Sequence, residues 1–200
     1  MKTHLSKGLG VIISENAAYT LRNDLEDVRR LGIKITKEDE LKNFDGVHIN
    51  IEEVNLKKLQ DFLGNFSEDL STVDVVAVGV QDHGVSPKGI SDRSFRINWI
   101  KNRLEDDNTP ENLAFSGVEI PSFLLRMKSA VKASRRQLPD AKVVVMDTSP
   151  AAILGCLLDP VSQKSNPLLI INVGNDHTMI AIVTKGQIMG ILEHHTGFIR

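Results

Sequence analysis

The sequence predicts an α/β fold, in which helices flank a mixed sheet and a β-hairpin meander closes the chain. Two observations lead to this prediction. Segments with apolar residues at helical spacing alternate with short apolar strands over most of the chain. Residues 168–193 then contain three consecutive strand patterns joined by two tight turns, the second of them Lys185-Gly186.

The N-terminal elements predict a β-α-β unit followed by a separate strand and helix. Residues 10–14 form a short apolar strand, and a helix with apolar side chains from Ala17 to Leu31 ends at Gly32, a typical C-cap residue. Residues 47–51 alternate apolar and polar side chains, which is typical of a half-buried strand. Asn55 is suited to cap the next helix.

The central elements are a buried strand, a long loop and another helix. Residues 73–80 are nearly all apolar, as in a strand covered on both faces. Residues 81–121 are rich in Gly, Ser, Pro and Asp and predict a loop, with one or two helical turns at 97–104. Pro121 is suited to the first position of the following helix. The buried stripe of that helix comprises Phe123, Leu124, Met127, Ala130 and Val131.

The last elements before the meander are the strand KVVVMD and a helix that Thr148 or Ser149 would cap, with Pro150 in its first turn. We expect an N-terminal α/β segment at 1–72 and a core domain at 73–200. Because the sequence stops directly after a strand that nothing covers, we also expect a fragment of a longer chain.

Composition limits the function classes. The net charge is −2 and 4% of the residues are aromatic, which argues against nucleic acid and membrane as partners. No apolar run approaches the length of a membrane span. One cysteine, Cys156, is consistent with the reducing cytoplasm. We therefore expect a cytoplasmic protein with a small-molecule ligand, and homo-oligomer formation remains open.

Polar residues follow four of the predicted strands, which predicts a ligand site. If strands 73–80, 142–146, 168–173 and 187–193 run parallel, their carboxyl ends share one rim, where open α/β sheets bind ligands. The rim residues are Gln81, Asp82 and His83, then Asp147, Thr148 and Ser149, then Gly174, Asn175, Asp176 and His177, and finally His194, His195 and Thr196.

The chemistry of these residues suggests three roles. The catalytic candidates are Asp82, His83, Asp147 and His177, for proton transfer or charge. The candidates for phosphate or nucleotide binding are Thr148, Asn172, Gly174, Asn175, Asp176 and Thr178. His194, His195 and Thr196 would line the substrate cleft, although strand alternation sends the two histidines to opposite faces.

Plainer interpretations remain open. Asn175-Asp176 is ordinary turn chemistry, and a histidine in a loop is often solvated. Arg93 and Arg96 suit either an anion clamp or a solvated loop. A metal site from Asp82, His83, His177 and one of His194 or His195 is a further alternative, without any zinc-binding motif.

Residues 168–193 resemble the second phosphate-binding segment of the actin-like ATPase superfamily, in which a strand, a glycine-rich turn and a β-hairpin follow a helix of small residues. The aligned turn is residues 172–179, and the helix is MDTSPAAILGCLLDP. The resemblance implies a ribonuclease H-like domain and a nucleotide or divalent metal ion as cofactor. Asn172 and Met179 replace acidic residues of the superfamily, and Asn cannot supply the charge that holds hydrated Mg²⁺.

Five stretches resemble a prokaryotic family of unknown function within that superfamily, some of whose members are labelled pyruvate formate-lyase activating enzymes. They are VQDHG, SDRSFR, MDTSPAAILG, NVGNDHT and EHHTG, and they span residues 80–197. The label implies an iron–sulfur cluster held by three closely spaced cysteines. Because this chain offers only Cys156, we reject the label for it.

Three function hypotheses follow. The first is an actin-like domain that binds a phosphorylated small molecule or nucleotide at the rim, with phosphoryl-transfer or hydrolase activity. The second is a non-catalytic regulatory or scaffold domain that keeps the same fold. The third is a metal-dependent hydrolase with His and Asp ligands.

Overall fold

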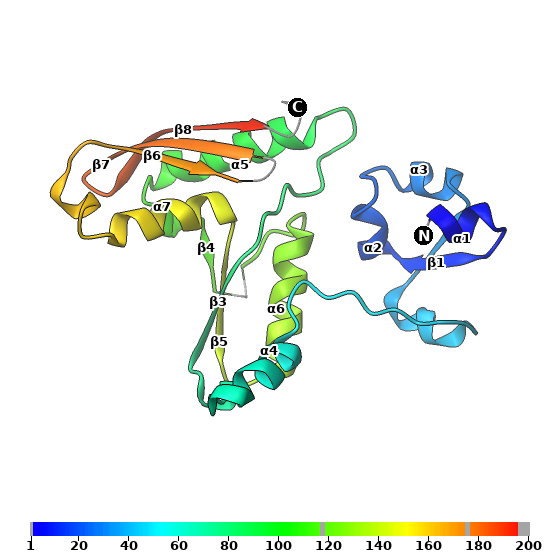
Figure 1. The fold of residues 1–200 in the computed structure, drawn as a ribbon. Coiled ribbons are helices and arrows are strands. Elements are labelled where there is room, and N and C mark those ends of the chain that lie inside the picture. Colours follow the sequence, from blue (N-terminus) through cyan, green and yellow to red (C-terminus); the bar gives the residue numbers. More distant parts are fainter. Residues whose placement is uncertain (1, 117–118, 175–176, 196–200) are drawn as a thin grey trace. The chain divides into compact units, whose positions relative to one another are not determined.

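The protein has an α/β fold in which helices flank mixed sheets (Figure 1). The computed structural model describes residues 2–116, 119–174 and 177–195. Its contacts divide the chain into two compact units. The first unit comprises residues 1–51 and 85–92, and the second comprises residues 52–84 and 93–200. The boundary expected between residues 72 and 73 lies within the second unit.

The first unit contains the predicted β-α-β arrangement. Strands β1 (Val11–Ser14) and β2 (Ile33–Thr36) pair in parallel. The helical elements are α1 (Lys2–Ser6), α2 (Glu15–Tyr19), α3 (Leu25–Arg30) and the 3₁₀ helix η1 (Glu38–Asn43). The prediction of one continuous helix was wrong, because the Asp24 side chain accepts a hydrogen bond from Glu26 N (2.9 Å) and starts α3 anew. Gly32 follows α3 with φ +81°, as its predicted C-cap role requires.

The predicted strand at residues 47–51 is absent. The side chains of Val47, Ile49 and Ile51 are 92%, 78% and 88% exposed. Within the described residues no other strand pairs with this segment. An alternating pattern forms a strand only where a neighbouring backbone completes its hydrogen bonds, so the pattern alone was insufficient.

The first sheet of the second unit has the order β3 (Val75–Gly79), β5 (Lys142–Met146), β4 (Ala114–Phe115). Strand β3 is parallel to β5, and β4 is antiparallel to it. Helix α6 (Leu125–Gln137) packs on this sheet through the predicted residues Leu124, Met127, Ala130 and Val131. The prediction that both faces of β3 are covered was wrong, because its residues are alternately exposed and part-buried.

Helical elements precede and follow β3. Asn55 caps α4 (Leu56–Leu63) as predicted, by accepting from Lys58 N (3.0 Å). The 3₁₀ helices η2 (Gly64–Phe66) and η3 (Leu70–Thr72) lead into the strand. Part of the predicted loop at 81–121 forms the 15-residue helix α5 (Asp92–Asp106) and the 3₁₀ helix η4 (Pro110–Leu113).

The extent of α5 and the start of α6 differ from the sequence prediction. Only Arg96 and Ile100 of α5 are fully buried, so the helix has no long apolar stripe for the sequence to display. Helix α6 begins at Leu125 and not at Pro121, because Leu124 N bonds Pro121 O (3.1 Å) in a preceding turn.

The second sheet is the predicted meander. Strands β6 (Leu168–Val173), β7 (His177–Thr184) and β8 (Gln187–His195) are antiparallel neighbours. Lys185 and Gly186 join β7 to β8 with φ of 52° and 79°, which is the geometry of a two-residue hairpin turn. Helix α7 (Thr148–Leu158) covers one face of this sheet, after which the 3₁₀ helix η5 (Ser162–Lys164) leads to β6 (Figure 1).

The arrangement of four parallel strands in one sheet was wrong. Strands β3 and β5 belong to one sheet, whereas β6 and β8 belong to the other and each pairs with the antiparallel β7 between them. Polar strand ends therefore come together where two sheets meet, and not along the edge of one.

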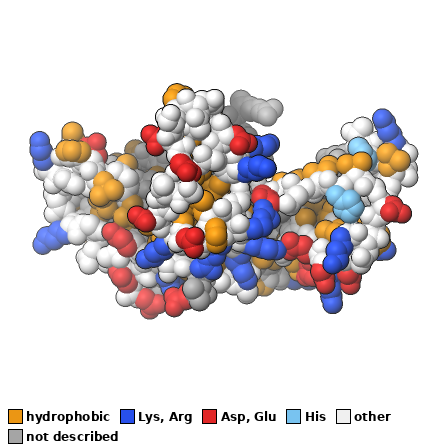
Figure 2. All heavy atoms as spheres, turned by 90° about the horizontal axis from the view of Figure 1, so that it is seen from below, with side chains coloured by type: hydrophobic (Ala, Val, Ile, Leu, Met, Phe, Trp, Pro, Cys, Tyr) orange, Lys and Arg blue, Asp and Glu red, His pale blue; other side chains and the backbone are white. Residues whose placement is uncertain are grey.

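The surface carries mixed charge and one apolar sheet face. Acidic and basic side chains are interspersed on the face shown in Figure 2. The outer face of the meander exposes Leu169, Ile171, Val173, Ile182 and Leu192. Among the described residues, no helix has the length and apolar character needed to cross a membrane.

Candidate functional site

The end of β3 and the start of β7 are joined by a side-chain hydrogen bond. Gln81 Nε2 lies 3.0 Å from His177 Nδ1, and the two residues are 96 positions apart in the sequence. The rings of His83 and His177 have centroids 5.3 Å apart and planes inclined by 57°. Two of the predicted rim histidines therefore lie together, although they come from different sheets.

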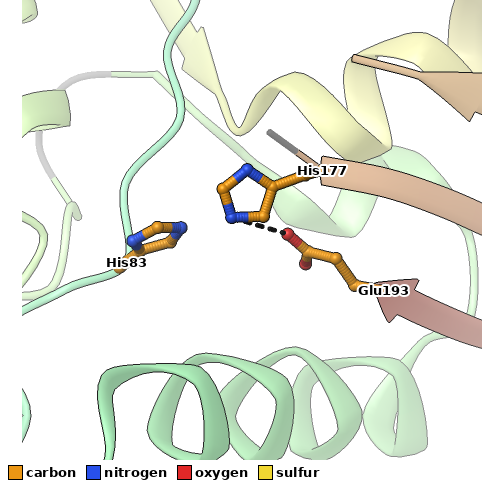
Figure 3. A group of neighbouring side chains, drawn as sticks. All are labelled: His83, His177 and Glu193. Carbon is orange, nitrogen blue, oxygen red and sulfur yellow. Dashed lines mark ion pairs between the residues drawn. The ribbon is translucent and has the colours of Figure 1, made fainter. Parts of the chain in front are cut away.

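A third side chain completes this cluster. Glu193, near the end of β8, points toward the two histidines (Figure 3). One potential ligand atom from each of His83, His177 and Glu193 can be chosen so that all lie within 4.8 Å of one another. Glu193 Oε1 lies 3.9 Å from His177 Nε2. Two imidazoles and one carboxylate form a set of side chains that divalent transition metals commonly use.

Arg96 of α5 connects Glu193 to the first sheet. Its guanidinium donates to Asp147 Oδ1 (2.8 Å) through Nη2 and to Glu193 Oε2 through Nη1. All three side chains are at most 6% exposed. Because buried charges require partners, this chain of ion pairs fixes the Glu193 carboxylate in position.

Asp147 begins α7 and also contacts the residues after β3. It is the N-cap of α7, accepting from Ser149 N (3.1 Å), in place of the predicted Thr148 or Ser149. Its Oδ2 atom accepts a hydrogen bond from Asp82 N (3.1 Å). The Asp147 carboxylate therefore joins a helix terminus, the end of β3 and Arg96.

Asp82 is not among the three side chains of this cluster. Its carboxylate accepts from Gly84 N (3.0 Å) and from Met127 N (3.0 Å), and so caps the N-terminus of α6, where Leu124 makes no capping side-chain bond. Burial raises the pKa of Asp82, and the backbone hydrogen bonds oppose this shift. Asp82 therefore serves the fold of the site, while its neighbour His83 faces the cluster.

Gly84 follows His83 and has a backbone conformation that favours glycine. It has φ +73°, and a Cβ atom there would lie 2.9 Å from the Phe123 ring. Any other residue would meet both backbone strain and a clash. Gly84 therefore lets the backbone adopt a left-handed conformation beside the Phe123 ring directly after His83.

Two arginines bring positive charge to the same region. Arg93 Nη2 donates to Glu193 O (3.0 Å), and Arg126 Nη1 donates to Gln81 O (2.6 Å). Arg126 is also paired with Glu53 through two bonds of 2.9 Å, whereas Arg93 is exposed and makes no ion pair in the described chain. Arg93 is therefore the guanidinium with more donors to offer an anion.

The structure brings some predicted site residues together and separates others. Asp82 is joined to Asp147 by a hydrogen bond and His83 to His177 by a ring contact, and Arg96 and Glu193 link the two pairs. Ser149 Oγ lies 3.5 Å from Arg96 Nη2. Thr148 is exposed in the first turn of α7. Thr178 pairs with His194 on the sheet face opposite to that of His177 and Glu193, while His195 occupies the position facing His177.

The predicted turn is only partly described. Asn172 is half-buried and opposite Met179, on the inner face. Gly174 N donates to His177 O (2.8 Å), so this amide serves the hairpin. Asn175, Asp176 and Thr196 lie outside the described residues.

Sequence reasoning missed Glu193 and left Arg96 in a loop. Glu193 takes an inward position in β8, where its neighbour on the same face is Ile191. A single acidic residue on the apolar face of a strand indicates a buried partner, and that signal was available. The identity of the partner depended on α5, whose extent the sequence did not reveal.

Comparison with known proteins gives one match. A family model described as "Putative pyruvate format-lyase activating enzyme (DUF1786)" matches residues 1–200. Neither a curated protein nor a solved structure matches the chain. Iron–sulfur clusters are held mainly by several cysteine thiolates, whereas Cys156 is the single cysteine and packs beside the core of the meander. The residues present do not fit such a cluster.

Proposed function

The chain belongs to this family, and we propose that it binds a phosphorylated small molecule or nucleotide where β3, β5 and β8 end and β7 begins. The observation that carries the proposal is the meeting of Gln81, His83 and His177 from two sheets. Ligand sites of α/β proteins form where strand ends converge with polar side chains.

The exposed guanidinium of Arg93 favours an anionic ligand. Arg93 is exposed and is oriented by the backbone carbonyl of Glu193, so its other N–H groups suit a phosphate oxygen. His83 or His177 would contribute proton transfer to the bound phosphate group. Hydrolysis of the phosphate group is the reaction that we propose for this site.

We also place the chain in the actin-like ATPase superfamily as part of this proposal. The antiparallel meander of β6, β7 and β8 follows helix α7, with the short 3₁₀ helix η5 between them, and a helix followed by a hairpin is also the order in the phosphate-binding segment of that superfamily. The proposed location is the cytoplasm, in keeping with one free cysteine.

Isothermal titration with ATP, ADP, a sugar phosphate and inorganic phosphate tests the proposal. We expect one of them to bind, and Arg93→Gln to weaken binding by roughly tenfold, equivalent to losing one charge-assisted hydrogen bond of about 1.5 kcal/mol. Arg30→Gln is the matched control, since Arg30 lies in the first unit and pairs with Asp27.

Phosphate release from ATP or p-nitrophenyl phosphate measures the reaction. The proposal fails if none of these compounds binds and a His83→Ala, His177→Ala double variant behaves as the unchanged protein does.

A further inference from the structure

We propose that His83, His177 and Glu193 bind one divalent transition-metal ion, inside the ligand site proposed above. The three residues come from the segment after β3, the start of β7 and the end of β8 (Figure 3). This inference extends the proposed function but does not depend on which phosphorylated compound binds there.

The geometry is close to that of a metal site. The three candidate ligand atoms lie within 4.8 Å of one another. Ligand atoms around one zinc ion lie about 2.0–2.2 Å from it, so neighbouring ligands are roughly 3–3.5 Å apart. Metal binding in this place therefore requires the three ligand atoms to move closer together than they lie in this structure.

Glu193 gives an independent reason to expect a ligand. The residue is 6% exposed, and its Oε2 atom is held by Arg96. Its Oε1 atom is buried and accepts no hydrogen bond from the described chain. A buried carboxylate oxygen without a donor costs free energy, and this one points at two imidazoles.

The charge of the buried network favours a cation. Asp82, Asp147 and Glu193 contribute three carboxylates, Arg96 contributes one guanidinium, and all four residues are at most 6% exposed. With every group ionised, three negative charges and one positive charge give these four residues a net charge of −2. A divalent ion beside Glu193 would neutralise this charge where water is largely excluded.

The residues around the cluster are suited to orient the ligands. Metal-bound histidines usually donate the N–H of their second ring nitrogen to an acceptor. The Gln81 amide lies 3.0 Å from His177 Nδ1 and, with its oxygen turned toward the ring, would accept that N–H. The opposite nitrogen, Nε2, faces Glu193. Arg96 holds Glu193 Oε2, so Oε1 is the oxygen available to a metal.

The ligand types select the class of metal. Imidazole and carboxylate together suit Zn²⁺, Fe²⁺ or Mn²⁺, whereas Mg²⁺ and Ca²⁺ prefer oxygen ligands alone. Three protein ligands leave coordination positions open for water and substrate, as in catalytic zinc sites. A metal in this place would activate water beside the phosphate group, with the proton of the attacking water passing to the leaving alcohol.

The test uses the full chain, freed of metal with a chelator and titrated with Zn²⁺ or Co²⁺ alone. We expect one ion per chain by elemental analysis and a visible Co²⁺ spectrum of nitrogen and oxygen ligation. The variants His83→Ala, His177→Ala and Glu193→Gln should each weaken binding at least tenfold. His194→Ala is the matched control, because this exposed histidine follows Glu193 but lies on the other face of β8.

Circular dichroism of each variant separates loss of a ligand from loss of fold. His83 is only half-buried, so His83→Ala decides the matter if Glu193→Gln does not fold. Absence of stoichiometric binding by the unchanged protein overturns the inference, as does full affinity in a folded His83→Ala variant. Phosphate binding measured on metal-free protein is a separate result, so the two proposals can fail independently.

Discussion

The side chain of Gln81 holds His177 across 96 positions of sequence, with Gln81 Nε2 3.0 Å from His177 Nδ1. This bond links the end of the first sheet to the start of the meander. It also leaves His177 Nε2 directed toward Glu193, 3.9 Å from the nearer carboxylate oxygen. The orientation of one imidazole is therefore set by a residue of another sheet.

Replacing Gln81 should weaken metal binding without removing a ligand. We expect Gln81→Leu to lower Zn²⁺ affinity by roughly 10–100-fold, because His177 loses the partner that fixes its ring. Titration calorimetry measures the change, and Gln163→Leu is the control, since Gln163 is exposed in η5. Unchanged affinity in Gln81→Leu would mean that this bond does not position His177.

Replacing Arg96 should strongly destabilise the second unit. We expect Arg96→Met to lower the free energy of unfolding by about 3–5 kcal/mol, because Asp147 and Glu193 would remain buried without their counter-charge. Arg126→Met is the control: its ion pair with Glu53 is partly exposed and contributes about 0–1 kcal/mol. Urea unfolding followed by Trp99 fluorescence measures both variants, and equal losses would contradict the difference in burial.

Glycine should be required directly after His83. We expect Gly84→Ala to cost about 1–2 kcal/mol for the left-handed backbone alone, with the clash against Phe123 in addition. Gly89→Ala is a matched control, because Gly89 has φ +86° but open space around its Cβ position. Trp99 lies beside Phe123, with centroids 6.0 Å apart, so its fluorescence should change in Gly84→Ala only. A similar spectrum in both variants would argue against the clash.

The stability of the metal-free protein should carry a pH-dependent contribution from Asp82. Burial raises the pKa of Asp82 above its unfolded value of about 3.9. The folded state then holds the proton more tightly, so the contribution is fully present below pH ~3.9 and is lost as pH rises through the folded pKa.

Asp82→Asn removes this titration. In buffer with a chelator, we expect the free energy of unfolding of the unchanged protein, relative to that of Asp82→Asn, to decrease as pH rises from about 4 to 7. Urea unfolding at several pH values measures the difference. A difference that increases with pH would show that the hydrogen bonds from Gly84 and Met127 outweigh burial.

Local patterns predicted the elements that depend on nearby residues. The meander of residues 168–193, the Lys185-Gly186 turn and the cap at Asn55 could all be read from the sequence, because hairpin turns and caps are decided within a few positions. Local patterns could not predict the extent of α5 or the failure of residues 47–51 to form a strand. Both depend on distant partners, a buried ion pair in one case and a missing neighbour strand in the other.

The sequence by itself determined the class of fold, the final hairpins and the expectation that His83 and His177 meet at strand ends. Only the tertiary structure decided which acidic residue joins them. Asp82 is adjacent to His83 in sequence but turns to cap α6, whereas Glu193 is 110 positions away and faces the cluster because Arg96 holds it. Buried charges take their positions from the partners that neutralise them, and those partners come from other elements of the fold.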